Sequence, residues 1–315
     1  MKDAEWRPPV VADLFSSRSL DGVLMNYPAA QTLMSSVRTE VRSGQPFERA
    51  IRSHVENSNP YIQRQVKELP IALQQFFFRV SHNYTTEAIN YSHLVNRTVG
   101  QGIQTAFITL NYDTLLEKSL TKIVGESFGA RDSYIGSADW LLVKLHGSVD
   151  WGYEWASTVS SALEAVRQFE PPNRRSELIQ VGLDLNLRKE NAVYYPAMVL
   201  PVEGKYDLVC PTEHITRLRE FLSNCSAYLF IGCSGSDEDL FDFLTETCGR
   251  VFLAGLVTGE SDHNDVVRRF KAKMPNAIAS PLGQDKYIFA RGFTKFLEQK
   301  LDGFLADLKQ YLGPR

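Results

Sequence analysis

The sequence predicts an α/β protein with a doubly wound parallel sheet, a helical N-terminal region and a helical cap insert. Three observations predict this class. The first hundred residues follow the helical period, with Pro8, Pro9 and Pro60 near predicted helix starts. Short apolar runs, each ended by small or polar residues, begin after residue 103. Amphipathic segments separate these runs, and strands that alternate with helices are typical of a parallel sheet.

We expect four strands that are buried on both faces, because each run is short, continuous and apolar. The runs are "TAFITLN" (105–111), "WLLVKLHGS" (140–148), "SAYLFIGCSGS" (226–236) and "RVFLAGLVTG" (250–259). The helical patterns between and after them include "TEHITRLREFLSNC", "DLFDFLTETC" and "DHNDVVRRFKAKM". Order and pattern together predict parallel strands with helical crossovers.

We expect a single domain over residues 1–315. Its predicted parts are a helical region (1–100), a sheet core (101–150 and 211–300), a cap insert (151–210) and a C-terminal helix (301–315). The insert contains the helical pattern "SALEAVRQFE". The amphipathic end of the chain fits either a helix that completes this domain or one that docks on a neighbouring subunit.

Composition limits the class of protein. With 315 residues, 43% of them hydrophobic, the chain can bury a sizeable core. The net charge of −3 indicates neither a nucleic-acid surface nor a membrane surface. No signal-peptide pattern and no apolar stretch of about 20 residues is present, so we expect a cytoplasmic protein. The four cysteines form no CxxC pair, so we expect no metal and no disulfide framework.

Polar residues follow three of the predicted strands. The first strand is followed by Asn111 and Asp113, the second by His146 and Gly147, and the third by Gly232 and Ser234, with Asp237 beyond. In a parallel sheet, ligands bind in the crevice beyond the carboxyl ends of the strands. We therefore expect these three groups to converge on one crevice.

Structural alternatives stay open for each group. Asn111 and Asp113 suit the start of the helix that begins near "DTLLEKSL", since amides and carboxylates favour helix N-termini. A histidine such as His146 is often satisfied by a backbone carbonyl. Ser234 and Asp237 also fit a helix entry with acidic residues in its first turn. For Asn111 and Asp113, a role at the helix start is compatible with a functional role.

Three segments resemble motifs of the sirtuin superfamily, in particular its bacterial sirtuin-like NAD-hydrolase branch. "TLNYD" is similar to the Thr-x-Asn-Tyr/Ile-Asp element, and "VKLHGSVDW" is similar to the Leu-His-Gly segment. "FIGCSGSDEDL" is similar to the Ile-Gly-x-Ser segment with its acidic turn and helix. Order and spacing agree across residues 80–300. The resemblance implies a Rossmann-like sheet that binds NAD and cleaves its nicotinamide glycosidic bond.

The resemblance also assigns roles to residues. It makes Asn111 and His146 catalytic: Asn111 would contact the ribose hydroxyls and a polarised water, and His146 would be the general base. Asp113 would lie at the nicotinamide end, and Gly232 and Ser234 under the adenosine or phosphates. The full set of implied cofactor-binding residues is Thr109, Asp113, Gly147, Gly232, Ser234 and Asp237.

The sequence departs from the family pattern in two ways. Members open with a strand and a Gly-Ala-Gly-x-Ser loop that cradles the pyrophosphate, and residues 1–15 contain no such loop. Either the sequence begins downstream of that loop or this member has lost its first strand. Protein-deacylating sirtuins carry paired-cysteine zinc sites after the His-Gly segment, whereas residues 149–209 contain no cysteine. Water is then the implied acceptor instead of an acyl-lysine.

Three functional hypotheses follow. The first is a sirtuin-like domain that hydrolyses NAD to ADP-ribose and nicotinamide in antiviral defence. Its expected ligands are NAD or ADP-ribose, and its expected partner is a second copy of the chain or a defence-system protein. The second is a catalytically silent module that binds a nucleotide or assists assembly. The third is an α/β enzyme that acts on another nucleotide or nucleoside.

Overall fold

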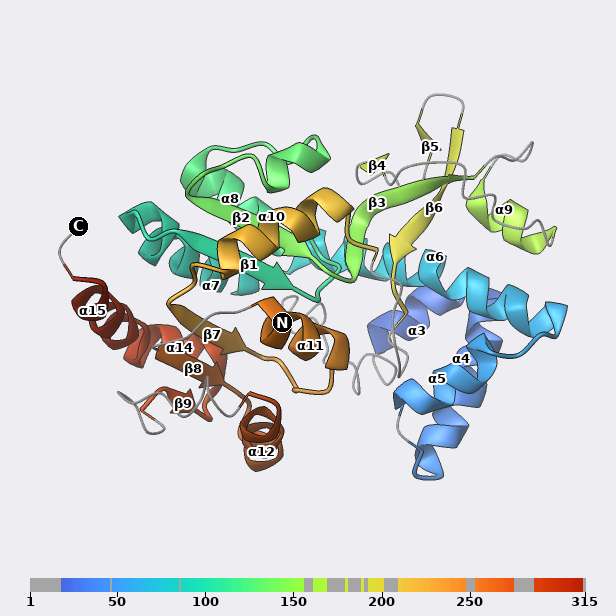
Figure 1. Cartoon of the computed structure of the whole chain (residues 1–315). Coiled ribbons are helices and arrows are strands. Elements are labelled where there is room, and N and C mark those ends of the chain that lie inside the picture. Colours follow the sequence, from blue (N-terminus) through green and yellow to red (C-terminus); the bar gives the residue numbers. More distant parts are fainter. Residues whose placement is uncertain are drawn as a thin grey trace. The chain divides into compact units, whose positions relative to one another are not determined.

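The structure divides into two compact units, which are described in turn. The computed structural model describes residues 18–45, 47–84, 86–155, 161–168, 179–180, 188–189, 192–200, 209–247, 253–274 and 286–313. Unit 1 comprises Met1–Ile89, Phe107–Ser137 and Leu142–Pro211, and unit 2 comprises Asn90–Ala106, Ala138–Leu141 and Thr212–Arg315. Figure 1 shows the labelled elements of both. Residues 1–15, in which the sequence contains no Gly-Ala-Gly-x-Ser loop, lie outside the described residues.

Unit 1 begins with a helical region, as the sequence predicts. Its helices are α3 (Arg18–Leu24), α4 (Pro28–Arg42), α5 (Phe47–Val55) and α6 (Pro60–Asn83). The start of α6 is capped, because the Asn59 side chain accepts a hydrogen bond from the Tyr61 N–H at 2.9 Å. Helices α3, α4 and α5 all pack on α6. Their shared core includes Leu33, Met34, Leu69 and Leu73.

Strands β1 (Thr105–Thr109) and β2 (Trp140–Lys144) form a two-stranded sheet. The Thr105 N–H donates to the Asp139 carbonyl at 2.9 Å, and the Leu145 N–H donates to the Thr109 carbonyl at 3.2 Å. Because both strands advance in the same direction between these two bonds, the pair is parallel. Helix α8 (Leu115–Val124) follows β1, and the short 3-10 helix η2 (Arg131–Tyr134) precedes β2.

The insert differs from the predicted helical cap. Only "ALEAVR" forms a helix in its described residues, α9 (Ala162–Arg167). The rest of the described insert is an antiparallel sheet of order β4-β3-β6-β5. Its strands are β3 (Gly147–Trp155), β4 (Ile179–Gln180), β5 (Arg188–Lys189) and β6 (Ala192–Met198). The Val and Tyr residues of "AVYYPAM" favour strands, and pairing with β3 satisfies the backbone.

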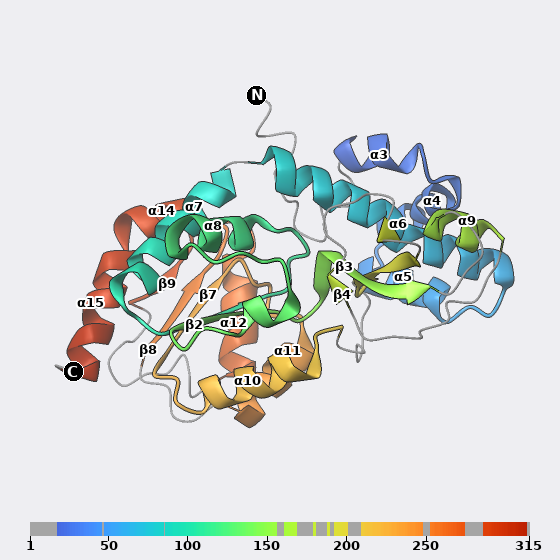
Figure 2. The ribbon, with the colours of Figure 1, turned by 90° about the horizontal axis from the view of Figure 1, so that it is seen from above.

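Unit 2 contains a three-stranded parallel sheet of order β7-β8-β9. Its strands are β7 (Ala227–Ile231), β8 (Leu253–Val257) and β9 (Ile288–Phe289). Its helices are α10 (Thr212–Leu222), α11 (Glu238–Thr247), α12 (His263–Lys273), α14 (Gly292–Gln299) and α15 (Leu301–Leu312). Helix α7 (Thr86–Arg97) joins unit 2 through its C-terminal part, where the Arg97 guanidinium pairs with Asp302. Figure 2 shows β7 and β8 side by side.

Helices cover both faces of this sheet. On one face, the ring of Phe230 in β7 lies 4.8 Å from Phe270 of α12 and 6.4 Å from Phe241 of α11, between ring centroids. On the other, a side chain at Gly255 of β8 would meet Phe304 of α15 at 3.2 Å. Adjacent residues of a strand point to opposite faces, which produces this division. The predicted α/β doubly wound class is confirmed, although the described strands pair as two parallel groups.

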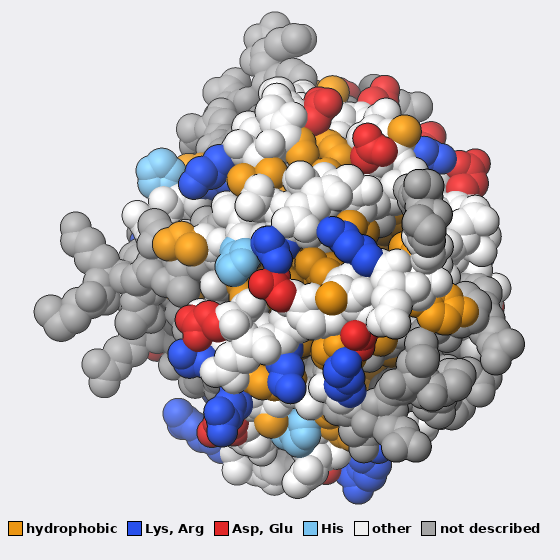
Figure 3. Space-filling view, turned by 90° about the vertical axis from the view of Figure 1, so that its left-hand side faces the viewer, with side chains coloured by type: hydrophobic (Ala, Val, Ile, Leu, Met, Phe, Trp, Pro, Cys, Tyr) orange, Lys and Arg blue, Asp and Glu red, His pale blue; other side chains and the backbone are white. Residues whose placement is uncertain are grey.

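One face of the molecule carries side chains of both charges. Figure 3 shows one face, on which Lys and Arg side chains are interspersed with Asp and Glu among hydrophobic side chains. None of the helices in the described part of the chain is long and apolar enough to cross a membrane.

Candidate functional site

The strand ends of β1 and β2 meet within unit 1. The Leu145 N–H donates to the Thr109 carbonyl at 3.2 Å, and the Val149 N–H donates to the Tyr112 carbonyl at 2.9 Å. These two bonds hold the segment after β1 against the segment after β2. The structure therefore brings together the first two of the three predicted groups, as parallel neighbouring strands require.

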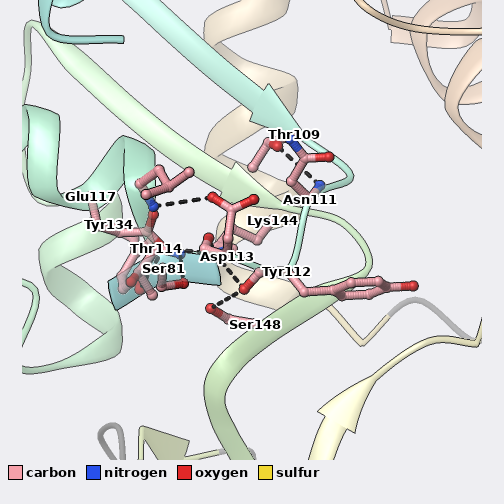
Figure 4. A network of polar contacts seen from close by, with 11 residues as sticks. Ser81, Thr109, Asn111, Tyr112, Asp113, Thr114, Glu117, Tyr134, Lys144 and Ser148 are labelled. Carbon is pink, nitrogen blue, oxygen red and sulfur yellow. Dashed lines mark hydrogen bonds and ion pairs between the residues drawn. The ribbon is translucent and has the colours of Figure 1, made fainter. Parts of the chain in front are cut away.

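Thr109 and Asn111 form an exposed turn at the end of β1. The Thr109 hydroxyl oxygen accepts a hydrogen bond from the Asn111 N–H at 3.0 Å, which is a local turn typical of threonine. Asn111 is exposed, and Figure 4 shows its side chain apart from those of Glu117 and Tyr134. A side-chain amide both donates and accepts hydrogen bonds, so it can meet a ligand hydroxyl. The assigned roles of both residues stay predictions.

Asp113 turns into the interior. It is 4% exposed, and its Oδ1 accepts a hydrogen bond from the Leu115 N–H at 3.1 Å, at the start of α8. This bond satisfies a helix N–H that has no partner within the helix. Burial raises the pKa of the Asp113 carboxyl, and the ammonium of Lys144 opposes that rise. The structural alternative thus holds for Asp113, and its contact with nicotinamide stays a prediction.

His146 and Gly147 form the turn between β2 and β3. The His146 side chain is half-buried, and its backbone carbonyl accepts a hydrogen bond from the Val199 N–H at 3.0 Å. Gly147 has a φ of +86°, and a Cβ added there would lie 1.9 Å from the Ala197 carbonyl oxygen. No residue with a side chain fits that space, so glycine is required for β3 to pair with β6.

The third predicted group lies in unit 2, on the loop between β7 and α11. Gly232 has a φ of +65°, and its N–H donates to the Val257 carbonyl at 2.9 Å. The Ser234 hydroxyl oxygen accepts a hydrogen bond from the Ser236 N–H at 3.3 Å. Asp237 Oδ1 accepts one from the Leu240 N–H at 2.8 Å, which caps α11. The helix-entry alternative is therefore observed, and Gly232 and Ser234 remain exposed.

Sequence reasoning missed a guanidinium that holds this loop. Arg269 of α12 donates from Nη1 to the Ser234 carbonyl at 2.9 Å and to the Ser236 hydroxyl at 3.1 Å. The neighbouring Cys233 thiol has a pKa raised by burial and by the charge of Asp237. "VVRRFKAKM" carries several cations, and no local pattern distinguishes Arg269 from the others.

A buried charged cluster beside the first group was also missed. Lys144 Nζ lies 2.7 Å from Glu117 Oε1, and the two side chains are 0% and 5% exposed. The Tyr134 hydroxyl donates to the same oxygen at 3.3 Å. Lysine is almost never fully buried without a partner. The available signal was Lys144 itself, a cation in the otherwise apolar strand "WLLVK".

Burial dominates the protonation of this cluster. It raises the pKa of Glu117 to about 7, with the ammonium of Lys144 opposing the rise and Asp150 adding to it. It also raises the pKa of Tyr134 well above its ordinary value, and the charges of Glu117 and Asp150 act in the same direction. The attraction between Lys144 and Glu117 therefore offsets only part of the free-energy cost of burying the Glu117 charge.

No group of three or more His, Cys, Asp or Glu side chains suited to a metal ion occurs among the described residues. The chemistry available at the strand ends is that of an exposed amide, an imidazole, hydroxyls and backbone N–H groups. Such groups bind sugar hydroxyls and phosphates and transfer protons.

Residues 105–250 match the family model of the SIR2-like domain. The match covers somewhat less than half of the chain, and it includes all three motifs with every predicted site residue from Thr109 to Asp237. Among curated proteins, no relative matches this chain.

Two solved structures are similar to this chain over most of its length. One, from a study of the structural basis for the mechanism and regulation of Sir2 enzymes, is 17% identical over 78% of this chain and 78% of that one, with a TM-score of 0.37. The other, Sir2Af2 bound to a myristoylated histone peptide, is 16% identical over 78% of this chain and 84% of that one, with a TM-score of 0.35. Sequence identities and TM-scores this low support no conclusion about individual residues of this chain.

Proposed function

We propose that this chain binds NAD and hydrolyses it to ADP-ribose and nicotinamide. The observation that carries the proposal is the SIR2-like match, since it spans the three serial motifs and all their polar residues. The contact between the strand ends after β1 and β2 supports it, because a hydrolase needs its ribose-binding amide and its base in one region.

The proposed reaction is a glycosidic cleavage by water. Water attacks the ribose carbon that bears nicotinamide, the carbon–nitrogen bond breaks, and nicotinamide leaves as a neutral molecule with the bonding electron pair. The transition state resembles an oxocarbenium ion. Asn111 orients the ribose hydroxyls and the water, and His146 accepts the proton that the water loses. Histidine suits this task because an imidazole changes its protonation near neutral pH.

In this proposal, the remaining predicted residues bind the substrate or position the groups that bind it. Thr109, Asp113 and Gly147 act near the nicotinamide and ribose end. Gly232 and Ser234 act at the adenosine or phosphate end, where an exposed glycine allows backbone N–H groups to approach a phosphate closely. Asp237 acts through its cap on α11, which sets the end of that loop.

The test measures NAD loss and nicotinamide release by the purified full chain. We expect Asn111→Ala and His146→Ala each to lower kcat by about 100-fold or more, the range of a lost general base or positioning group. Matched controls are Asn83→Ala and His93→Ala, which remove exposed side chains of the same types on α6 and α7. Undiminished turnover in either site variant, with an intact fold, contradicts the assignment.

A catalytically silent nucleotide-binding module is the second candidate. The observation that favours it is the commitment of Asp113 to the helix start and to a buried environment, which leaves its carboxylate little freedom to meet a ligand. This candidate predicts that NAD or ADP-ribose raises the unfolding temperature by mass action while no nicotinamide appears. Release of nicotinamide that depends on His146 excludes it.

The proposed role in antiviral defence rests on the motif resemblance. It predicts that bacteria expressing the chain resist phage and lose NAD on infection, and that the Asn111→Ala variant abolishes both effects. Protection that persists in that variant would separate defence from NAD hydrolysis.

A further inference from the structure

The Lys144 ammonium is fully buried and surrounded by acceptors. Its side chain is 0% exposed, and β2 is buried along its whole length. Nζ lies 2.7 Å from Glu117 Oε1, 2.5 Å from the Asp113 carbonyl oxygen and 3.3 Å from the Tyr112 carbonyl oxygen. An ammonium has three N–H donors, so these three acceptors use its full capacity.

Two of those acceptors belong to the backbone that follows Asn111. The Tyr112 carbonyl also accepts the Val149 N–H at 2.9 Å, so Lys144 and β3 both hold the same peptide group. Figure 4 shows this arrangement, in which Lys144 and Ser148 converge on the backbone at Tyr112 and Asp113. On the other side of Asn111, its N–H is bound to the Thr109 hydroxyl. Both flanks of Asn111 are therefore fixed.

Stability alone does not account for this pair. A buried ion pair carries a large desolvation cost, and apolar side chains of similar volume often stabilise a protein equally well or better. An apolar pair at these positions would leave the Tyr112 and Asp113 carbonyls without the ammonium. Unlike an apolar side chain, Lys144 donates hydrogen bonds to the backbone beside Asn111, and the Glu117 carboxylate neutralises its charge.

We propose that Lys144 is a positioning residue, whose ammonium, neutralised by Glu117, holds the Tyr112 and Asp113 carbonyls and thereby fixes the turn that presents Asn111. The inference rests on the proposed NAD hydrolysis for its catalytic consequence. Its structural part, the hold on the backbone after Asn111, stands independently of that function.

The decisive variant replaces both charged partners with apolar residues, Lys144→Met together with Glu117→Leu. We expect it to fold with some loss of stability, because both charges of the pair are removed together while the buried Asp113 carboxyl loses the ammonium that favours its charged form. We expect kcat for NAD to fall by about 100-fold, because a displaced catalytic group costs on that order, while KM changes less. The matched control is Glu68→Gln, which alters another buried carboxylate of unit 1 that holds the Ala29 N–H of α4 at 3.0 Å. Its turnover should stay unchanged.

Amide hydrogen exchange separates this inference from the proposed function. In the double variant, we expect faster exchange at residues 111–114 and unchanged exchange along α6. If the wild type does not release nicotinamide, the proposed function fails, while faster exchange in the double variant still supports the hold by Lys144. The inference is overturned if the double variant folds and either its kcat or its amide exchange at residues 111–114 equals that of the wild type.

Glu117→Gln keeps the test decisive if the double variant does not fold. In this variant Lys144 retains both carbonyl acceptors, so protection at residues 111–114 should persist even though stability falls. Loss of that protection in Glu117→Gln, with the rest of unit 1 still protected, would show that the lysine does not hold the turn by itself and would overturn the proposal.

Discussion

The loop after β1 and the loop after β7 both carry predicted site residues, but they are held in different ways. The first is tied to a fully buried lysine on β2, 31 positions from the Asp113 carbonyl that it holds. The second is held by bonds that span two or three residues, from the Ser236 N–H to Ser234 and from the Leu240 N–H to Asp237. Two longer-range bonds also reach this loop, one from the Gly232 N–H to the Val257 carbonyl and one from the surface Arg269 guanidinium to the Ser234 carbonyl.

Two loops that both carry predicted site residues are thus held in place at very different costs in free energy. A charge inside a protein must be paired and hydrogen-bonded, so the first loop depends on every member of its cluster. Local caps contribute about 1 kcal/mol each and fail independently. We therefore expect changes around the first loop to be severe and changes in the second to be mild.

The largest loss of stability is expected for Gly147→Ala. The added Cβ would lie 1.9 Å from the Ala197 carbonyl oxygen, at a φ of +86°. Strain at positive φ and overpacking each cost about 1–3 kcal/mol, so we expect a loss of about 2–6 kcal/mol in the free energy of unfolding. Urea denaturation of the purified chain measures it. A loss below about 1 kcal/mol would mean that β3 shifts away from β6 without penalty.

The next effect is a pH dependence that comes from Glu117. Its folded pKa of about 7 lies above the ordinary value of 4.5, so the folded state binds the proton more tightly than the unfolded state. The contribution of Glu117 to the free energy of unfolding is therefore fully present below pH 4.5 and is lost as the pH rises through 7. The upper limit of the loss is about 3 kcal/mol.

Urea denaturation at several pH values, compared between the wild type and Glu117→Gln, isolates this contribution. We expect the stability of the wild type relative to the variant to fall as the pH rises between 4.5 and 7. A difference that grows with pH would show that the Lys144 ammonium lowers the pKa of Glu117 more than burial raises it.

A smaller effect is expected for Gly232→Ala, the counterpart of Gly147→Ala in the second loop. Gly232 also has a positive φ, +65°, but an added Cβ meets no atom within 4 Å. Only the left-handed backbone conformation is then penalised, by about 1–2 kcal/mol. If this variant loses as much stability as Gly147→Ala, the close approach of Ala197 is not what makes Gly147 necessary.

The smallest effect is expected for Asp237→Ala. It removes the side-chain acceptor for the Leu240 N–H at the start of α11, and lost caps cost about 1 kcal/mol. Asp237→Asn is the matched control, because asparagine retains the acceptor and caps helices about as well. Thermal unfolding of both variants measures the difference. If the two substitutions destabilise the protein equally, the expectation is wrong.

Much of the fold could be predicted from the sequence, because it depends on local pattern. The runs "TAFITLN" and "SAYLFIGCSGS" contain β1 and β7. The helical patterns contain α10 and α12 and cover α11 except for its first residue. In the described part of the insert, an antiparallel sheet stands where the prediction was mainly helical, because the long-range pairing of β3 with β6 leaves no local signal.

The sequence by itself located the ends of three strands, since Asn111, His146 and Ser234 each follow an apolar run and lie just beyond β1, β2 and β7. The roles of these three residues stay predictions. Only the tertiary structure decided that Lys144 and Glu117 form a buried pair beside Asp113, and that Gly147 has no room for a side chain. The physical reason is that periodicity reports which face of an element is apolar, whereas the pairing of buried charges and the approach of two backbones depend on residues far apart in the chain.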